Sequence, residues 1–576
     1  METNPPVQSP SSDPSLAARV GWAVLIVSTL CVCYFSHLGA IGLVGPDEPR
    51  YAWIAREMAE TGDWVTPRLY GKPWFEKPPL YYWGAALSFK LFGVSEAAAR
   101  LPSAVSALLG TLALAWLAWR LYGVETACWL LLLLPTTVGM IGFSHAAATD
   151  MPFSAMLSIA MVAAAVVVRL APEANASMVG DAAAGRASPP ATKAWLTLVA
   201  FGFFLGLAVL AKGPAAIILC GGAMFLWALC TKCWRDVFRL LHPIAVAAFC
   251  CTALPWYILC GRRNPDFFRV FIIEHNFKRY LTPEFQHVQP FWYYIPILLL
   301  ALLPWTNLLS WSASFGAQRL LREKQLSAAV TFFVSWTLFV VIFFSISRSK
   351  LPGYILPAIP AIAILLARSY VALVPGNRKS FCWALLSTAF ALFSISLFLL
   401  FARRMPQANQ RFAAAAILIV AAIGAANLFL GWFSLTHEQT AFLRLAAASS
   451  VLPILITLSL TDKLLPSFFR WDPSGRSIAR ELEFRRIPTS QLAVAGMSRG
   501  LHYSLNFYVA TELKDWDRNN PSEGYLLMPE RHCTSVVPPT FFCEEIPFDQ
   551  EATGSFLYRV TPANLPDRPR GGGQLQ

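Results

Sequence analysis

The chain has 576 residues, of which 56% are hydrophobic and 14% are charged, and its mean hydropathy is +0.50. A soluble core cannot bury so much apolar side chain, so this composition excludes an ordinary soluble globular protein and predicts a polytopic membrane protein. The net charge is +13, but residues 462–576 carry 13 Lys and Arg against 14 Asp and Glu. The excess positive charge therefore belongs to the preceding part of the chain.

Thirteen apolar runs are long enough to cross a bilayer, which takes roughly 17 to 25 residues of helix. They lie near 20–43, 101–119, 126–143, 151–168, 195–211, 214–230, 242–260, 290–309, 328–346, 353–374, 381–401, 413–433 and 442–461. The first run is too long for the apolar part of a signal peptide, and no clear cleavage site follows it. We therefore expect it to be a retained transmembrane helix.

The distribution of Lys and Arg predicts the orientation. With the N-terminus inside, most Lys and Arg of the short loops fall on the inner side, in agreement with the positive-inside rule. The outer loops also contain positive charge, at Arg262, Arg263, Lys278, Arg279, Arg348, Lys350, Arg403 and Arg404. We interpret these residues as donors for an anionic ligand on the outer side, because unpaired cations are costly near a membrane.

The first outer loop, residues 44–100, is too long for a simple connector. Within LVGPDEPRYAWIARE (43–57), five charged residues occur in eleven positions: Asp47, Glu48, Arg50, Arg56 and Glu57. They form either a solvated loop or a reaction centre at the membrane edge. Apolar residues recur at helical spacing in RYAWIAREMAETGDW (50–64), which predicts a helix along the membrane surface.

A proline-rich turn follows this first helix. Pro73, Pro78 and Pro79 forbid a continuous helix and present Glu76 and Lys77 on a stiff turn. We expect a second interfacial helix after the turn.

The chain from residue 462 onward is predicted to form a second domain outside the membrane, because an odd number of spans places it there. The short apolar stretches QLAVAG (491–496), GYLLMP (524–529) and SFLYRV (555–560), with a helix around 499–510, indicate a small α/β domain. Cys533 and Cys543 are its two cysteines, and an oxidising compartment permits a disulfide between them. Residues 1–461 form the transmembrane domain.

Four stretches together resemble a known family. They are GPDEPRYAWIAREMAETGDWVTPRLYGKPWFEKPPLYYW in the first outer loop, ATDMPFSA (148–155), FIIEHNFKRYLTPEFQHVQPFWYYIPILLLALLPW (271–305) and SRSKLPGYILPAIPAIAIL (347–365). The combination is similar to the aminoarabinose transferases that modify lipid A. More widely, it resembles the polyprenyl-phosphate-dependent glycosyltransferases of the GT-C superfamily, including protein O-mannosyltransferases. The resemblance extends over roughly residues 20 to 460, in the order of the family.

The resemblance implies an all-α membrane fold with thirteen transmembrane helices, two juxtamembrane helices in the first outer loop and a terminal periplasmic domain. The implied location is the inner membrane of a bacterium. The implied reaction is inverting transfer of a sugar from a polyprenyl phosphate such as undecaprenyl phosphate to lipid A or another envelope acceptor. We expect neither nucleotide nor nucleic acid to take part.

Two alternative functions remain. One is a protein O-mannosyltransferase-like enzyme. The other is a lipid transporter, which would place charges near the membrane midplane on broken helices. The charges of this chain gather in the outer loops, which favours the enzyme.

Two carboxylates are the candidate catalytic residues. Glycosyl transfer needs a carboxylate near the acceptor and positive charge on the departing phosphate. Asp47 matches the acidic residue in the first loop of the family, and it would orient the acceptor or act as a base toward a hydroxyl. Asp150 matches another acidic residue of the family. It lies at the outer end of the fourth span, where the alternative is an ordinary helix N-cap.

Cations and tyrosines supply the other candidate contacts. Lys77, Arg279 and Lys350 form the candidate clamp for the leaving phosphate, although snorkelling to the interface also explains Lys350. Tyr354 is a further candidate phosphate contact. Three residues are candidate contacts for the sugar or the acceptor: Tyr51, Tyr82 and Glu48. A helix-dipole role is the alternative for Glu48.

Glu76 and His275 match family positions that lie close together and can hold a divalent cation. Two ligands make an open and weak site, because a stable protein zinc site has three or four. We therefore expect no required cofactor, with a divalent cation at this pair left open. The alternative is a hydrogen bond between Glu76 and His275 that shapes the loop.

Overall fold

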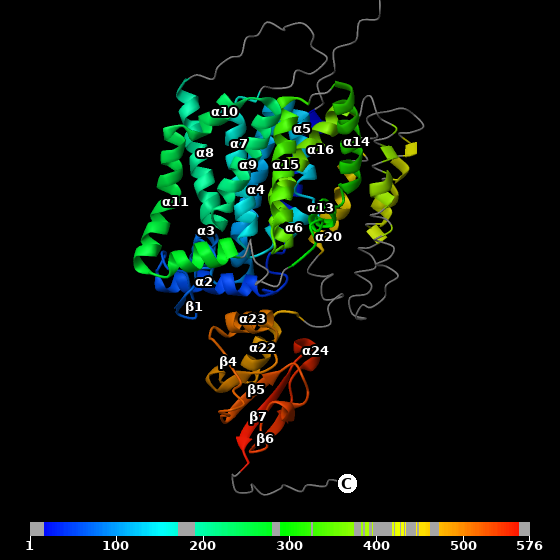
Figure 1. Ribbon diagram of the computed structural model, residues 1–576. Coiled ribbons are helices and arrows are strands. Elements are labelled where there is room, and N and C mark those ends of the chain that lie inside the picture. Colours follow the sequence, from blue (N-terminus) through cyan, green and yellow to red (C-terminus); the bar gives the residue numbers. More distant parts are fainter. Residues whose placement is uncertain are drawn as a thin grey trace, which may run out of the picture.

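The computed structural model describes residues 16–170, 191–278, 288–323, 326–373, 448–460 and 472–563, together with isolated positions between 379 and 445. Long helices run side by side and form a bundle, and a smaller domain that contains a β-sheet lies at one end of it (Figure 1). The helical bundle and the separate α/β domain agree with the architecture predicted from the sequence.

The helices of the bundle follow one another along the chain. They are α1 (Leu16–Phe35), α4 (Glu96–Tyr122), α5 (Val124–Leu133), α6 (Val138–Ser144), α7 (Asp150–Val167), α8 (Ala191–Lys212), α9 (Ala215–Thr231), α10 (Trp234–Phe238), α11 (Pro243–Arg263), α13 (Tyr294–Ala301), α14 (Thr306–Glu323), α15 (Ala328–Ile346), α16 (Ile359–Leu373) and α20 (Leu452–Ser459). A π-helix, η2 (Arg269–Lys278), and a 3-10 helix, η3 (Pro352–Ala358), lie at the end of the bundle that faces the sheet domain.

Local sequence signals explain where the longest helix begins and ends. Ser95 accepts a hydrogen bond from the Ala98 amide at 3.2 Å and caps the N-terminus of α4. Glu96 occupies its first turn and Arg120 its last, where their charges complement the helix dipole. Gly123, with φ of +93°, ends the helix in a conformation that suits glycine.

Small residues allow the bundle helices to approach closely. A Cβ atom added at Gly110 of α4 would lie 3.2 Å from the Cα of Ala155 on α7. A Cβ at Gly202 of α8 would lie 2.0 Å from the carbonyl oxygen of Ala245 on α11. Helices in a membrane associate through such close packing, because lipid removes the hydrophobic driving force between them.

Among the described residues, six helices are long and apolar enough to cross a membrane, or eight if two bent helix pairs are each counted as one span. The bent pairs are α5 with α6, at 65°, and α13 with α14, at 112°. They coincide with the runs expected at 126–143 and 290–309. The expected spans at 381–401 and 413–433 lie largely outside the described residues, as does part of the span at 442–461.

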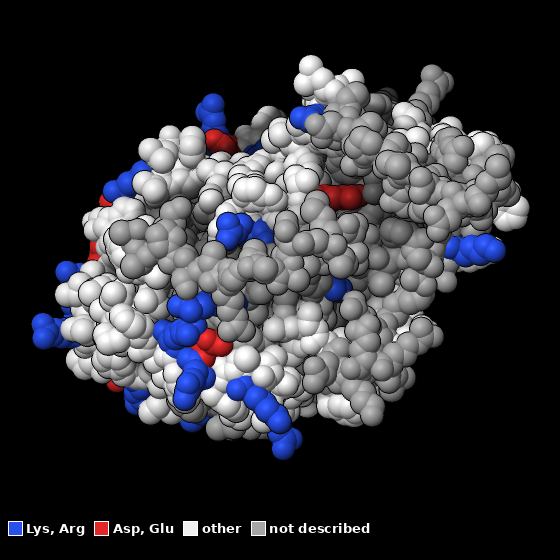
Figure 2. Space-filling view, turned by 90° about the horizontal axis from the view of Figure 1, so that it is seen from above, with Lys and Arg blue, Asp and Glu red and all other residues white. Residues whose placement is uncertain are grey.

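Positive charge marks the end of the bundle opposite the sheet domain. Figure 2 looks onto this end and shows Lys and Arg prevailing over Asp and Glu. Basic residues at this end of the bundle are Arg120, Arg169, Lys232, Arg235, Arg239 and Arg368.

Two helices joined by a hairpin cover the other end of the bundle. They are α2 (Asp47–Thr61) and α3 (Leu80–Phe92), and the strands β1 (Arg68–Leu69) and β2 (Lys72–Pro73) pair between them. Helix α2 lies across the bundle, between it and the sheet domain (Figure 1). The apolar stripe of α2 predicted from the sequence is buried, as at Tyr51, Ile54 and Met58. The two expected interfacial helices are therefore present.

The C-terminal domain is built around a five-stranded mixed sheet with the order β4-β3-β5-β7-β6. Its elements are α22 (Arg476–Phe484), β3 (Leu492–Val494), α23 (Arg499–Val509), β4 (Lys514–Asp515), β5 (Gly524–Met528), β6 (Phe541–Ile546), α24 (Gln550–Thr553) and β7 (Phe556–Pro562). Strand β3 runs parallel to β4 and β5, and β7 runs antiparallel to β5 and β6. The three strands and the helix predicted from the sequence are confirmed.

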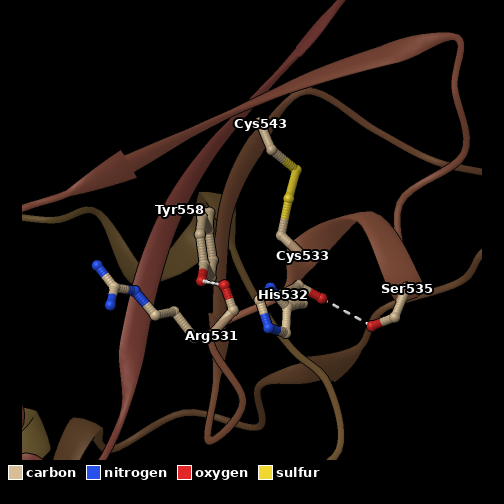
Figure 3. The surroundings of a disulfide bond; sticks show 6 residues. All are labelled: Arg531, His532, Cys533, Ser535, Cys543 and Tyr558. Carbon is tan, nitrogen blue, oxygen red and sulfur yellow. Dashed lines mark hydrogen bonds between the residues drawn. A yellow bond between two sulfur atoms is a disulfide. The ribbon is translucent and has the colours of Figure 1, made fainter.

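Cys533 and Cys543 form a disulfide, as the sequence suggested, with their Cα atoms 6.7 Å apart. Figure 3 shows that it ties the segment before β6 to β6 itself, while the Tyr558 hydroxyl donates to the carbonyl of Arg531. Strand β6 is an edge strand and has a neighbour on one side only. The disulfide therefore fixes a part of the domain that the sheet holds weakly.

Replacing Cys533 and Cys543 together by serine should lower the free energy of unfolding of the C-terminal domain by about 3 kcal/mol, because the disulfide closes a short loop. Limited proteolysis of the full chain across a temperature series, read with an antibody to the tail, measures this. Cys31→Ser, at an exposed free cysteine, is the control. Equal midpoints for the double variant and wild type would contradict the prediction.

Candidate active site

A buried ion pair holds the start of α2 against the bundle. The guanidinium of Arg100 on α4 donates to the Glu48 carboxylate at 2.8 and 3.1 Å. Its remaining N–H groups donate to the carbonyls of Leu38, Ile41 and Gly42 at 2.6 to 2.9 Å. All five N–H donors of Arg100 are thus used, each with a different acceptor oxygen.

Glu48 is equally well satisfied. Besides Arg100, its oxygens accept from the amide of Val44 at 3.0 Å and from the amide of Ala147 at 2.7 Å. These contacts use all four acceptor positions of the carboxylate, which leaves none for a sugar or an acceptor. We therefore assign Glu48 a structural role in place of the ligand contact expected from the sequence. Because Ala147 closely precedes α7, the pair brings the N-termini of α2 and α7 together.

Asp47, the neighbour of Glu48, belongs to a separate cluster. Its carboxylate lies 2.5 Å from the Arg50 guanidinium, which also contacts the Glu76 carboxylate at 3.0 Å. The side chain of Arg50 is 5% exposed and that of Glu76 10%, whereas that of Asp47 is 50% exposed. Arg50 thus joins one buried carboxylate to one that faces solvent.

Electrostatics favour the charged form of Arg50. Burial alone would lower the pKa of the guanidinium, but the negative charges of Glu76 and Asp47 outweigh it and raise the pKa. Burial also raises the pKa of Tyr51 and of Tyr82 well above the ordinary value, and Glu76 adds to both shifts. Both tyrosines are therefore neutral hydrogen-bond donors at physiological pH.

Three donors of this cluster are buried and lack a hydrogen-bond acceptor among the described residues. They are the Tyr82 hydroxyl, the Trp74 indole N–H and the Nε of Arg50. They lie close together. The Arg50 guanidinium is 5.4 Å from the Trp74 ring and 5.3 Å from the Tyr51 ring, and the Tyr51 ring is 5.8 Å from the Tyr82 ring. Buried donors without acceptors cost free energy, so they indicate a ligand that supplies the acceptors.

A second acidic residue is held by a lysine that the sequence analysis did not single out. Lys212, the last residue of α8, lies 2.5 Å from the carboxylate of Asp150 at the start of α7. The ammonium of Lys212 also lies 4.6 Å from the centre of the Tyr354 ring on η3. The signal for Lys212 was present, because it is a single cation at the end of an apolar run.

Lys350 is a buried cation held by backbone carbonyls. Its ammonium donates to the carbonyls of Ser347 at 2.5 Å and Gln289 at 3.0 Å, and the residue is 6% exposed. Among the described residues no carboxylate lies within ion-pair distance of it. Burial, with the nearby charge of Arg348, lowers the pKa of Lys350.

For the remaining candidate site residues the structure gives fewer contacts. Lys77 lies half-buried in the turn between β2 and α3, and Arg279 lies outside the described residues. His275 lies on η2. Phe267, two residues before η2, has its ring centre 5.3 Å from that of Phe75, the neighbour of Glu76. In the described ranges, no three His, Cys, Asp or Glu side chains are grouped to hold a metal ion.

The family model described as dolichyl-phosphate-mannose-protein mannosyltransferase matches residues 22–271. Curated relatives include the undecaprenyl phosphate-alpha-4-amino-4-deoxy-L-arabinose arabinosyl transferases of Enterobacter sp. (strain 638) and Serratia proteamaculans. The first is 31% identical over 62% of this chain and 61% of the relative. The second is 33% identical over 61% of this chain and 59% of the relative. The matches thus span about three fifths of the length of these relatives.

Among solved structures, the fold is similar to that of ArnT from Cupriavidus metallidurans bound to undecaprenyl phosphate. The TM-score is 0.73, with 25% sequence identity, and the match covers 95% of this chain and 99% of that structure. The apo structure of the same protein gives a TM-score of 0.72. These comparisons confirm the resemblance to the aminoarabinose transferase-like proteins of the GT-C superfamily, related to O-mannosyltransferases, that the motifs indicate.

Replacing Arg100 by leucine should lower the free energy of unfolding by about 3–5 kcal/mol, because Glu48 would remain buried without its cation. Thermal unfolding of the protein in detergent measures the change. Arg120→Leu is the matched control, because Arg120 is exposed on the same helix. Equal destabilisation by the two substitutions would argue against the role of the ion pair.

Proposed function

We propose that this protein is an inner-membrane glycosyltransferase that moves a sugar, aminoarabinose or a related one, from a polyprenyl phosphate to lipid A or another envelope acceptor. The observation that carries the proposal is the Asp47–Arg50–Glu76 cluster, in which a half-exposed carboxylate is held by a buried cation beside unsatisfied buried donors. The similarity to arabinosyl transferases and to a structure bound to undecaprenyl phosphate supports it.

Asp47 acts on the acceptor in this proposal. An oxygen of the acceptor attacks the anomeric carbon from the face opposite the phosphate, and the bond between that carbon and the phosphate oxygen breaks. The polyprenyl phosphate leaves with the electron pair, so the configuration inverts. If the acceptor is a hydroxyl, Asp47 takes its proton, whereas an ionised phosphate acceptor needs only positioning.

Arg50 holds the Asp47 carboxylate in place. Because Arg50 is shared with Glu76, Asp47 is held on one side only and half of its side chain stays open to an acceptor. The buried donors of Tyr82 and Trp74 are placed to bind sugar oxygens, which would satisfy them. We therefore propose that Glu76 serves as an ion-pair partner of Arg50. A divalent cation at Glu76 and His275 is then dispensable.

Positive charge at the same end of the bundle serves the leaving phosphate. Neutral carbonyls hold the buried ammonium of Lys350, and they do not neutralise its charge. A phosphate would therefore bind Lys350 more strongly than it would bind a lysine already paired with a carboxylate. Lys77 and Arg279 are proposed to complete this clamp, with Tyr354 as a further donor. Asp150 holds Lys212 beside Tyr354 and is proposed to position both.

The membrane arrangement follows from charge and hydropathy. We propose thirteen transmembrane helices in the inner membrane of a bacterium, with the basic end of the bundle (Figure 2) in the cytoplasm. The active site and the C-terminal domain would then face the periplasm. An oxidising compartment there suits the Cys533–Cys543 disulfide.

Replacing Asp47 by asparagine should lower transfer by about a hundredfold or more if Asp47 acts as a base. A loss of about tenfold is expected if it only positions an ionised acceptor. Membranes with matched expression receive a panel of radiolabelled polyprenyl-phosphate sugars and envelope extract, and the label in the acceptor is measured. Glu60→Gln, an exposed carboxylate on the same helix, is the control.

The same assay with the wild-type protein distinguishes a transferase from a transporter. Movement of label from carrier to acceptor supports the transferase, and the labelled product identifies donor and acceptor. Absence of transfer from every donor, with lipid carrier still moved across the bilayer, would show a transporter instead.

Replacing Lys350 by methionine should raise the KM for the donor about tenfold, because a hydrogen bond between ions is worth roughly 1.5–3 kcal/mol. The same substitution should leave unchanged or raise the thermal midpoint of the lipid-free protein, since it removes a buried cation that lacks a carboxylate partner among the described residues. Donor titrations and thermal unfolding measure the two effects. A lower midpoint with an unchanged KM would show that Lys350 has a purely structural role.

A further inference from the structure

The C-terminal domain docks on the segment that leads into Asp47. The Tyr508 hydroxyl on α23 accepts from the amide of Leu43 at 2.9 Å, and the Ser504 hydroxyl donates to the Leu43 carbonyl at 2.6 Å. Asn506 donates to the Tyr70 hydroxyl at 2.9 Å. Helix α23 therefore faces α2 and the hairpin directly, in agreement with Figure 1.

Arg476 on α22 fixes this docking from a second side. Its guanidinium donates to the carbonyls of Gly39 and Ala40 at 3.2 Å and to the Glu96 carboxylate at 3.3 Å. The two surfaces also meet without space between them, since a Cβ atom added at Gly500 would lie 2.9 Å from the backbone of Gly45. Gly45 precedes Asp47 by two residues, so the first turn of α23 lies next to the proposed acceptor carboxylate.

Tyr503 and Arg499, on this first part of α23, extend the positive charge of the site toward the surface. The Tyr503 ring lies 6.0 Å from the guanidinium of Arg50 and 5.4 Å from that of Arg499. The Nε of Arg499 donates to the Tyr503 hydroxyl at 3.3 Å. Arg499 is exposed, Tyr503 is half-buried and Arg50 is buried. The three side chains therefore form a continuous path from solvent to the centre of the cluster.

We propose that Arg499 and Tyr503 form the entrance for a phosphate-bearing acceptor and set the specificity of the enzyme for it, an inference that rests on the function proposed above. An exposed guanidinium attracts phosphate and binds it with two N–H groups in a fixed geometry. The Tyr503 ring holds Arg499 over the path and contacts Arg50 at its inner end.

The position of Arg499 and Tyr503 favours contact with the acceptor over contact with the donor. The cations proposed for the donor phosphate, such as Lys350, lie in loops of the membrane domain. Arg499 and Tyr503 instead approach from the C-terminal domain, where the first turn of α23 lies against Gly45, two residues before the half-exposed Asp47. An acceptor that approaches along the side chains of Arg499 and Tyr503 would meet Arg499 first and Asp47 last.

The test measures KM and kcat for both substrates with the full-length protein, lipid A as acceptor and a polyprenyl-phosphate sugar as donor. Arg499→Gln should raise the KM for lipid A roughly fivefold at low salt, with kcat and the KM for the donor unchanged. Added salt should reduce the difference from wild type, because exposed charges are screened. Arg499→Lys should restore part of the affinity, because it keeps the charge but lacks the paired N–H groups. Tyr503→Phe should weaken acceptor binding because Arg499 loses its hydroxyl contact.

Arg518→Gln, at an exposed arginine of the same domain, is the matched control and should behave as wild type. An unchanged KM for lipid A in Arg499→Gln would overturn the inference, as would an increase in the KM for the donor instead. If Arg499→Gln and Arg499→Lys raised the KM for lipid A equally and also lowered the thermal midpoint, Arg499 would have a structural role. That result would also overturn the inference. Absence of transfer by the wild type would instead reject the proposed function.

Discussion

The architecture of the candidate site depends on the buried pair of Glu48 and Arg100. Each member uses its whole hydrogen-bonding capacity, so the pair avoids the penalty that makes buried charges destabilising when their other groups are unsatisfied. Through Leu38, Ile41 and Gly42 it fixes the end of the first membrane segment, and through Ala147 it fixes the approach to α7. Asp47 and Asp150 owe their places to this arrangement.

The adjacent carboxylates Asp47 and Glu48, at the start of α2, lie in different surroundings. Glu48 faces the bundle and is fully satisfied, whereas Asp47 faces outward and is held by Arg50 alone among its ion-pair partners in the described ranges. Arg50 also forms an ion pair with Glu76, which lies in the proline-rich turn. The Asp47 carboxylate thus remains half exposed, because its counter-ion is also anchored by Glu76.

The C-terminal domain is part of this arrangement. Its hydrogen bonds to Leu43 and its close approach at Gly45 hold the segment immediately before Asp47. Tyr503 then brings an aromatic ring to Arg50 from outside the membrane domain. In the proposed function, both domains therefore form the acceptor side of the site.

Hydropathy and periodicity are local properties of a chain, so they sufficed to predict the membrane class, the two interfacial helices and the strands of the terminal domain. It also indicated the charged start of α2, where Asp47 and Arg50 lie, and the pairing of Cys533 with Cys543. Three contacts are visible in the folded chain alone: Glu48 pairs with Arg100, Lys212 holds Asp150 and Tyr503 reaches Arg50. These partners are separated by 52, 62 and more residues in the chain, and no local pattern specifies which distant side chain the packing of helices brings into contact.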